Sequence, residues 1–141
     1  MSTILDVQYV VLELGEEKYA LRIYDIYEVI KMQKITEVPN SKPYMLGVIN
    51  LRGKIVPIIS LRKRFGLTEV PVTKSTRIVV VKIQEEIVGI VVDGVNKVTT
   101  FTDIQPPSDI VSGVDGNYFE GIGQSEEGLV SILKIHHLLH G

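Results

Sequence analysis

Residues Tyr44 to Phe65 read YMLGVINLRGKIVPIISLRKRF, and residues Tyr118 to Leu139 read YFEGIGQSEEGLVSILKIHHLL. The two stretches align without a gap when Tyr44 is placed on Tyr118, an offset of 118 − 44 = 74 positions. The alignment predicts that the chain is a tandem of two related copies. At the predicted turn, the first copy has NLRG at 50–53 and the second has QSEE at 124–127, so corresponding turns carry opposite charge.

The repeat extends toward the N-terminus at a slightly smaller offset. Two predicted strands at Tyr9–Leu14 and Lys18–Ile23 recur at Arg77–Ile83 and Ile87–Val92, where Ile78 lies 78 − 9 = 69 positions after Tyr9. Each pair is separated by a short acidic turn, which is typical of a hairpin. The change of offset places about five additional residues in the loop from Gln105 to Asn117, since loops tolerate insertions.

We expect one domain, residues 1–141, made of two subdomains. The polar stretch Thr68 to Thr76 contains a proline, so the junction is placed there, with subdomains at 1–75 and 76–141. An N-terminal strand that crosses from one subdomain to the other remains compatible with the sequence.

The composition favours strands. Val and Ile together number 38 against 12 Leu, and β-branched residues favour extended structure. The run Ile78–Val81 and the segment Ile87–Val92 are apolar at almost every position, as strands covered on both faces are. Short strands at close spacing predict a mostly β fold with two small antiparallel barrels packed together.

Short helices are expected after the last strand of each copy. Ser60 can cap a helix over Leu61–Phe65, and Gly66 can end it. A second, C-terminal helix is predicted to begin near Lys134, a poor cap. The segment Tyr24–Ile30 fits one face of a helix and one face of a strand, and the pattern alone does not decide between them.

The sequence offers little for catalysis. It has no cysteine, no Gly-x-Ser-x-Gly elbow and no phosphate-binding glycine loop. His136 and His140 are spaced to grip a metal on one helical face, but the local sequence lacks a third ligand, and we expect a solvated helix end. We therefore expect no enzymatic activity, no cofactor and no metal.

The net charge of −2 gives no broad electropositive field for nucleic acid or for an anionic membrane. The N-terminal residues have no signal-peptide pattern, and no apolar run approaches the roughly 20 residues that span a bilayer. These observations predict a soluble, cytoplasmic protein.

A protein-binding surface is the remaining expectation. Two abutting barrels would form a groove able to receive an amphipathic helix, and aliphatic residues of both copies could line it. These residues are Ile26, Val29, Val95 and Val98. Arg52, at a predicted hairpin tip, could pair with a partner's carboxylate. Glu28 is a second charged candidate for the partner-binding surface.

The segment Gly47–Gly66, GVINLRGKIVPIISLRKRFG, closely resembles the signature of the bacterial chemotaxis coupling family CheW and of the related regulatory domain of the histidine kinase CheA. The segment Val88–Val95, VGIVVDGV, resembles the second block of that family, and the similarity runs from about Tyr9 to Leu139. One departure is Ser60, where the family usually has Asp; both residues cap helices about equally well.

The resemblance implies a single CheW-like domain of two SH3-like five-stranded β-barrels. It also implies a non-enzymatic adaptor that couples transmembrane chemoreceptors, the methyl-accepting chemotaxis proteins, to CheA. Such an adaptor would be cytoplasmic, recruited to membrane receptor clusters, and not inserted in the membrane. Matched by position, the residues tied to receptor binding are Ile26, Glu28, Val29, Arg52 and Val98. Those suggested for the kinase regulatory domain are Ile55 and Ile110.

An alternative is a small-barrel nucleic-acid-binding protein that uses Arg52 and the basic run Arg62–Arg64. The acidic balance of the chain and the lack of an exposed aromatic platform count against this alternative. The adaptor hypothesis expects no nucleic acid among its partners.

Overall fold

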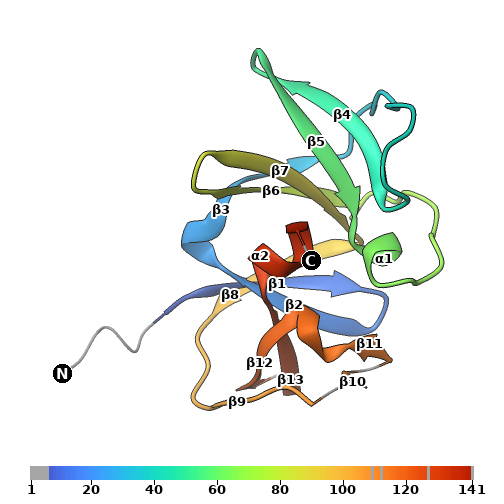
Figure 1. Ribbon diagram of the computed structural model, residues 1–141. Coiled ribbons are helices and arrows are strands. Elements are labelled where there is room, and N and C mark those ends of the chain that lie inside the picture. The colour runs from blue at the N-terminus through green and yellow to red at the C-terminus, as the bar shows by residue number, and fades with distance from the viewer. Residues whose placement is uncertain (1–6, 109, 112, 127, 141) are drawn as a thin grey trace. The chain divides into compact units, whose positions relative to one another are not determined.

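The structure is a computed structural model that describes residues 7–108, 110–111, 113–126 and 128–140 (Figure 1). The strands are β1 Tyr9–Leu14, β2 Glu17–Arg22, β3 Ile26–Lys31, β4 Met45–Leu51, β5 Lys54–Ser60, β6 Arg77–Ile83, β7 Glu86–Val92, β8 Gly94–Thr99, β9 Ile104–Gln105, β10 Ile110–Val111, β11 Val114–Asp115, β12 Phe119–Ser125 and β13 Gly128–Leu133. The helices are α1 Leu61–Arg64 and α2 Ile135–His140, with 3-10 turns η2 Ile23–Asp25 and η3 Gly116–Tyr118. The predicted mostly β fold with short helices, one of them C-terminal, is confirmed.

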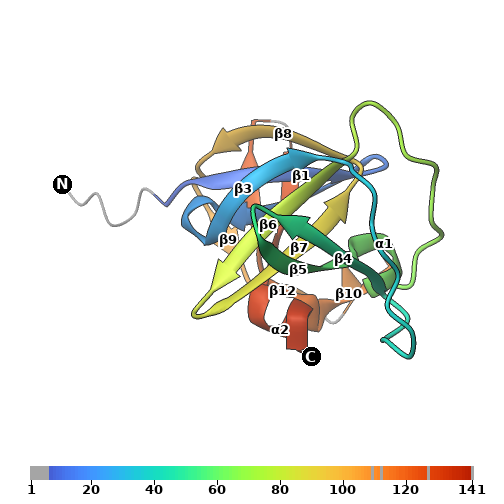
Figure 2. The same cartoon turned by 90° about the horizontal axis from the view of Figure 1, so that it is seen from above.

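The chain forms two compact units. The central unit comprises Asp25–Gly94, and its sheet has the strand order β3-β6-β7-β5-β4. The terminal unit comprises Met1–Tyr24 and Val95–Gly141, and its sheet has the order β8-β1-β2-β13-β12-β9. Figure 2 shows β3 alongside β6 and β4 alongside β5, in agreement with the pairing of the central sheet.

This division differs from the expected subdomains 1–75 and 76–141. The first hairpin of each copy lies in the sheet formed by the other copy's later strands: β1–β2 pairs with β13, and β6–β7 pairs with β5. The two parallel pairings are equivalent, because Ile58 lies opposite Gly89 as Ile132 lies opposite Ala20. Either hairpin could complete either sheet, so residue pattern alone does not choose between them.

The duplication extends to the register of individual residues. In β4–β5, Met45 is opposite Ile59 and a bulge precedes Gly47; in β12–β13, Phe119 is opposite Leu133 and a bulge precedes Gly121. The isolated bridge between Thr36 and Val48 corresponds to the pairing of Gln105 with Ile122 that forms β9. Both units therefore share this backbone contact. In the central unit it is a single bridge, and in the terminal unit it extends to the two-residue strand β9. The additional residues of the second copy follow Gln105, as expected.

Each unit has its own core. In the central unit the buried cluster is Ile49, Val56, Ile58, Ile78 and Val80. In the terminal unit it is Tyr9, Ala20, Val130 and Ile132, with Phe101 packed against it. Phe101 fills the space above Gly123, the counterpart of Ile49, and its ring centroid lies 4.9 Å from that of Tyr9.

Local signals in the sequence explain both ends of α1. The Ser60 hydroxyl accepts a hydrogen bond from the backbone N–H of Lys63 at 3.1 Å, which is the predicted N-cap. Gly66 follows with a φ of 77°, and its N–H donates to the Lys63 carbonyl at 3.0 Å. The ambiguous segment Tyr24–Ile30 contains the end of the 3-10 turn η2 and most of strand β3. None of the helices in the described part of the chain combines the length and apolarity needed to cross a membrane.

Candidate protein-binding site

The hairpin of β4 and β5 ends in a two-residue turn. Leu51 and Lys54 form the last pair, and Arg52 and Gly53 between them have φ values of 50° and 89°. Positive φ at both positions is the geometry that matches the twist of paired strands. The Asn50 side-chain oxygen accepts the Gly53 N–H at 2.8 Å and closes the turn. The Arg52 side chain is left 62% exposed at the tip.

Arg52 forms a forked ion pair with Glu28. Its Nη1 donates to Glu28 Oε2 at 3.3 Å, and its Nη2 donates to Glu28 Oε1. Glu28 is on β3, and Arg52 directly follows β4; these are the two outermost strands of the central sheet. The sheet therefore curls until its two edges approach each other. The isolated Thr36–Val48 bridge also joins the segment that follows β3 to β4 by backbone hydrogen bonds.

The strand β3 positions Glu28 through its alternation. Ile26, Glu28 and Ile30 are half-buried, while Tyr27, Val29 and Lys31 are exposed. The pairing of β3 with β6 shifts between Ile26 and Glu28, which makes Tyr27 an additional, bulged residue. Because bulges redirect side chains, Tyr27 can interact with Arg52 although its neighbours alternate in direction.

The pair shifts the titration of both groups. The hydrogen bond from Arg52 is the largest cause that lowers the pKa of Glu28, and the positive charge of Arg52 adds to it against a partial desolvation. The pKa of Arg52 is raised by the hydrogen bond to Glu28, with a smaller effect from Tyr27. Both groups are therefore charged at neutral pH, and solvent screens the attraction between them.

A cavity of about 140 Å³ lies beside Arg52 in the central unit. It is lined by Tyr27, Leu51, Arg52, Lys54, Val56 and Ile87. The lining combines an apolar floor with a cationic rim, and the volume is below the roughly 300 Å³ at which small-molecule sites begin. Such a cavity suits one or two side chains of a protein partner.

The structure brings some of the expected receptor-binding residues together. Ile26, Glu28 and Val29 are on β3, and Glu28 contacts Arg52. Val98 lies on β8, which belongs to the terminal sheet, and is 48% exposed. The prediction that Val98 shares one surface with the other four stays a prediction, as does the groove between subdomains. Sequence reasoning missed Tyr27, Lys54 and Ile87, whose positions follow only from the bulge and the curled sheet.

The two residues suggested for kinase binding lie in different units. Ile55, at the start of β5, is 65% exposed. Ile110 is in β10, where its backbone pairs with Asp115. Its side chain lies outside the part of the chain that the structure describes.

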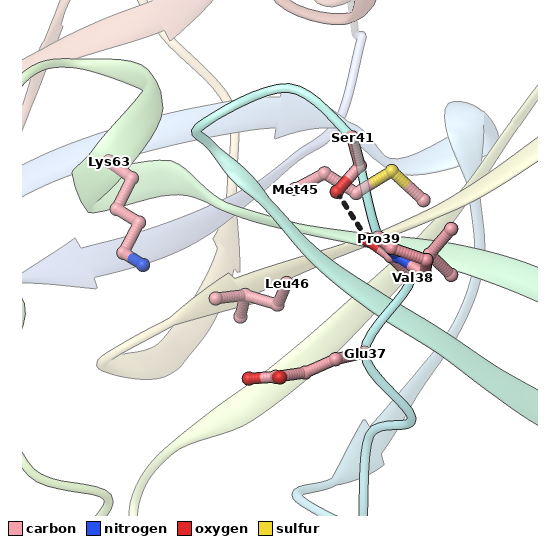
Figure 3. Close-up of a pocket in the computed structure, with 7 residues that line it drawn as sticks. All are labelled: Glu37, Val38, Pro39, Ser41, Met45, Leu46 and Lys63. Carbon is pink, nitrogen blue, oxygen red and sulfur yellow. Dashed lines mark hydrogen bonds between the residues drawn. The ribbon is translucent and has the colours of Figure 1, made fainter.

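A larger cavity, of about 390 Å³, lies elsewhere in the central unit (Figure 3). Its lining residues are Glu37, Val38, Pro39, Ser41, Met45, Leu46 and Lys63. In Figure 3 Lys63 and Glu37 extend from opposite sides, with Leu46 between them. The Ser41 hydroxyl donates to the Val38 carbonyl at 2.9 Å, a hydrogen bond within the loop between β3 and β4. Sequence reasoning did not identify this cavity.

The basic run Arg62–Arg64 is partly engaged within the central unit. Arg62 donates to both carboxylate oxygens of Asp93, at 3.0 and 2.5 Å. The Arg64 guanidinium lies 4.3 Å from the centre of the Tyr44 ring, a cation–π contact. Two of the three cations thus have partners in the fold, which weakens the nucleic-acid alternative.

The comparisons with known proteins found relatives that match over nearly the whole chain. The family model described as the CheW-like domain matches residues 8–141. "Chemotaxis protein CheW" of Helicobacter pylori is 37% identical over 134 residues, covering 94% of this chain and 81% of that protein. "Chemotaxis protein CheW" of Bacillus subtilis is 34% identical over 133 residues, covering 92% and 85%.

A solved structure is similar over almost the whole length. The "scaffolding protein TtCheW" of Thermoanaerobacter tengcongensis superimposes with a TM-score of 0.87 at 38% identity, and the match covers 96% of this chain and 89% of that one. Sequence and fold therefore agree over the same residues: the chain belongs to the CheW-like family.

Proposed function

We propose that the chain is a non-enzymatic chemotaxis scaffold that couples transmembrane chemoreceptors to the histidine kinase CheA. The observation that carries the proposal is the exposed Arg52–Glu28 pair beside an apolar cavity of about 140 Å³. A guanidinium at a rigid hairpin tip, with aliphatic surface next to it, suits a protein partner that presents both a carboxylate and an apolar side chain. The names of the relatives as chemotaxis and scaffolding proteins support the same function.

The receptor partner in this proposal is the helical tip of a chemoreceptor's cytoplasmic region. A helix presents side chains three and four positions apart on one face, so a single helix can reach the cavity and the ion pair at once. Its contacts would be Ile26, Glu28, Val29 and Arg52, with Val98 contributing from the terminal unit. Binding at this surface would recruit a cytoplasmic protein to membrane receptor clusters without insertion in the bilayer.

The kinase partner in this proposal is the regulatory domain of CheA. Ile55 offers an exposed aliphatic anchor on the central unit, and the loop around Ile110 is the second proposed contact. Separate surfaces for receptor and kinase would let one chain hold both partners, which raises the local concentration of each near the other. Signal transfer further requires that binding differ between receptor states.

The test is recruitment of the chain by a receptor cytoplasmic fragment in a pull-down. Arg52→Glu places two carboxylates together at the tip and is expected to reduce recruitment at least tenfold, with an unchanged circular dichroism spectrum. Lys74→Glu makes the same charge change at an exposed position of the loop before β6, and is expected to leave recruitment unaltered.

A double variant, Arg52→Glu with Glu28→Arg, tells whether the partner needs the pair or the guanidinium. Restored recruitment would mean that the pair only shapes the tip, whereas continued loss would mean that Arg52 itself contacts the receptor. Recruitment of Arg52→Glu at the level of the unmodified chain would remove this tip from the site.

A further inference from the structure

The three histidines of the chain lie together in α2, the red helix in Figure 1. Leu138 is fully buried and anchors this helix in the terminal unit. His137 is half-buried, and its ring meets the Tyr118 ring edge-on with centroids 5.4 Å apart. His136 and His140 are both exposed. His137 therefore packs against Tyr118, and His136 and His140 are exposed one helical turn apart.

The geometry of the exposed pair fits a shared ligand. The ring centroids of His136 and His140 are 5.0 Å apart, and the ring planes are inclined at 54°. A transition metal binds imidazole nitrogen at about 2.0–2.1 Å, so two donor nitrogens on one ion lie about 3 Å from each other. The ring centroids of these two exposed side chains are close enough that a change of side-chain rotamers would bring two donor nitrogens to that separation.

We propose that His136 and His140 form a two-ligand site for a divalent first-row transition metal ion such as Ni²⁺, Cu²⁺ or Zn²⁺. Imidazole is a suitable ligand for these ions, whereas Mg²⁺ and Ca²⁺ prefer oxygen. Within the residues that the structure describes, no group of three or more His, Cys, Asp or Glu side chains is placed to hold a metal. The remaining coordination positions are therefore open to water or to a partner's side chain.

Metal binding would stabilise the folded form of α2. A helix of six residues is too short to be stable by itself and depends on packing. An ion that joins positions 136 and 140 closes one turn and binds the folded state preferentially, which stabilises that state by mass action. Affinity is expected to increase from Zn²⁺ and Ni²⁺ to Cu²⁺, following the usual order for nitrogen ligands.

The test is calorimetric titration of the full chain, without a histidine tag, with NiCl₂. We expect one ion per chain, and at least a tenfold loss of affinity in His136→Gln and in His140→Gln. His137→Gln removes a histidine from the same helix that belongs to the Tyr118 contact, so it is the matched control and should bind Ni²⁺ within twofold of the unmodified chain.

A second measurement separates binding from folding. Ni²⁺ should raise the melting temperature of the unmodified chain and of His137→Gln, and should leave that of the other two variants unchanged. Binding by His136→Gln or His140→Gln at the original affinity would overturn the proposal. An equal loss of affinity in His137→Gln would overturn it as well, since the site would then not be the pair.

Discussion

The β4–β5 and β12–β13 hairpins share one register and differ at their tips. Both begin with a bulge before a glycine and end after the same number of pairs. Arg52 at the first tip corresponds to Glu126 at the second, an offset of 126 − 52 = 74. Glu28 corresponds to Lys97 on β8, an offset of 97 − 28 = 69. The two positions that form the ion pair in the central unit thus carry the reversed charges in the terminal unit.

The comparison shows which residues the fold constrains and which it leaves free to diverge. Some buried positions keep their character, as with Ile58 and Ile132, because a change of volume in a packed core is costly. Where Gly123 replaces the buried Ile49, the Phe101 ring fills the space. The charge at an exposed hairpin tip can be reversed without destabilising the fold. One framework used twice can therefore offer two different surfaces to two different partners.

The largest expected difference between the hairpins is at their equivalent glycines. Gly47 has a φ of 145°, and a Cβ there would lie 2.1 Å from the Thr36 carbonyl oxygen, a backbone atom that cannot move aside. Gly47→Ala is expected to cost about 3 kcal/mol or more in unfolding free energy. In Gly121→Ala the nearest atom, at 2.7 Å, is a side-chain methyl of Ile104, and we expect about 1–2 kcal/mol.

Urea denaturation of both alanine variants gives the comparison directly. A cost at Gly121 that equals or exceeds the cost at Gly47 would show that the two bulges are held in the same way, contrary to the backbone angles.

A second difference is the start of the helix that follows each hairpin. Ser60 is 2% exposed; it caps α1, and its hydroxyl donates to Glu69 at 2.7 Å. Ser60→Ala should cost about 1–2 kcal/mol. The counterpart Lys134 is exposed, and Lys134→Ala should change stability by less than about 0.5 kcal/mol. Thermal unfolding of the two variants measures both values, and similar losses would contradict the asymmetry.

The third difference concerns Ile55 and its counterpart Leu129, which are 65% and 67% exposed. Ile55→Ser is expected to weaken binding to the CheA regulatory domain about five- to tenfold, the loss typical of a truncated apolar anchor. Leu129→Ser removes a similar area from the other hairpin and should alter that binding less than twofold. Surface plasmon resonance with the immobilised domain checks both, and equal losses would mean that the kinase does not distinguish the hairpins.

The smallest expected effect is a titration. The pKa of Glu28 is lowered chiefly by its hydrogen bond from Arg52, so the pair contributes stability above the ordinary carboxyl pKa and loses it as pH falls through the lowered value. In Arg52→Ala the hydrogen bond and the positive charge are lost, and the pKa of Glu28 should rise to its ordinary value or above it. Carboxyl ¹³C shifts measured against pH follow the group, and an unchanged midpoint would show that the pair does not persist in solution.

Much of the fold can be predicted from the sequence because the signals that determine it are local. The turns, the Ser60 cap, the glycine after α1 and the position of the additional loop residues each depend on a few neighbouring side chains. The gapless alignment of the two copies agrees with the registers of β4–β5 and β12–β13, in which the same bulge recurs before Gly47 and Gly121.

The rest depends on contacts between distant residues. Ala20 and Gly89 occupy equivalent places, so the pattern does not say which hairpin completes which sheet. Arg52 and Glu28 were each identified, but their contact spans 24 positions and arises only because the sheet curls until its edges meet. The Ser60 hydroxyl was expected only as a cap, and its bond to Glu69 depends on the path of a loop without regular structure.

The exchange of hairpins between the two sheets has a consequence for the integrity of the chain. A protease that cuts the loop between α1 and β6 would produce two fragments, and each fragment would hold some strands of both sheets and all the strands of neither. Neither fragment could satisfy its strand edges alone, so the nicked halves should remain interlocked and refold only in each other's presence.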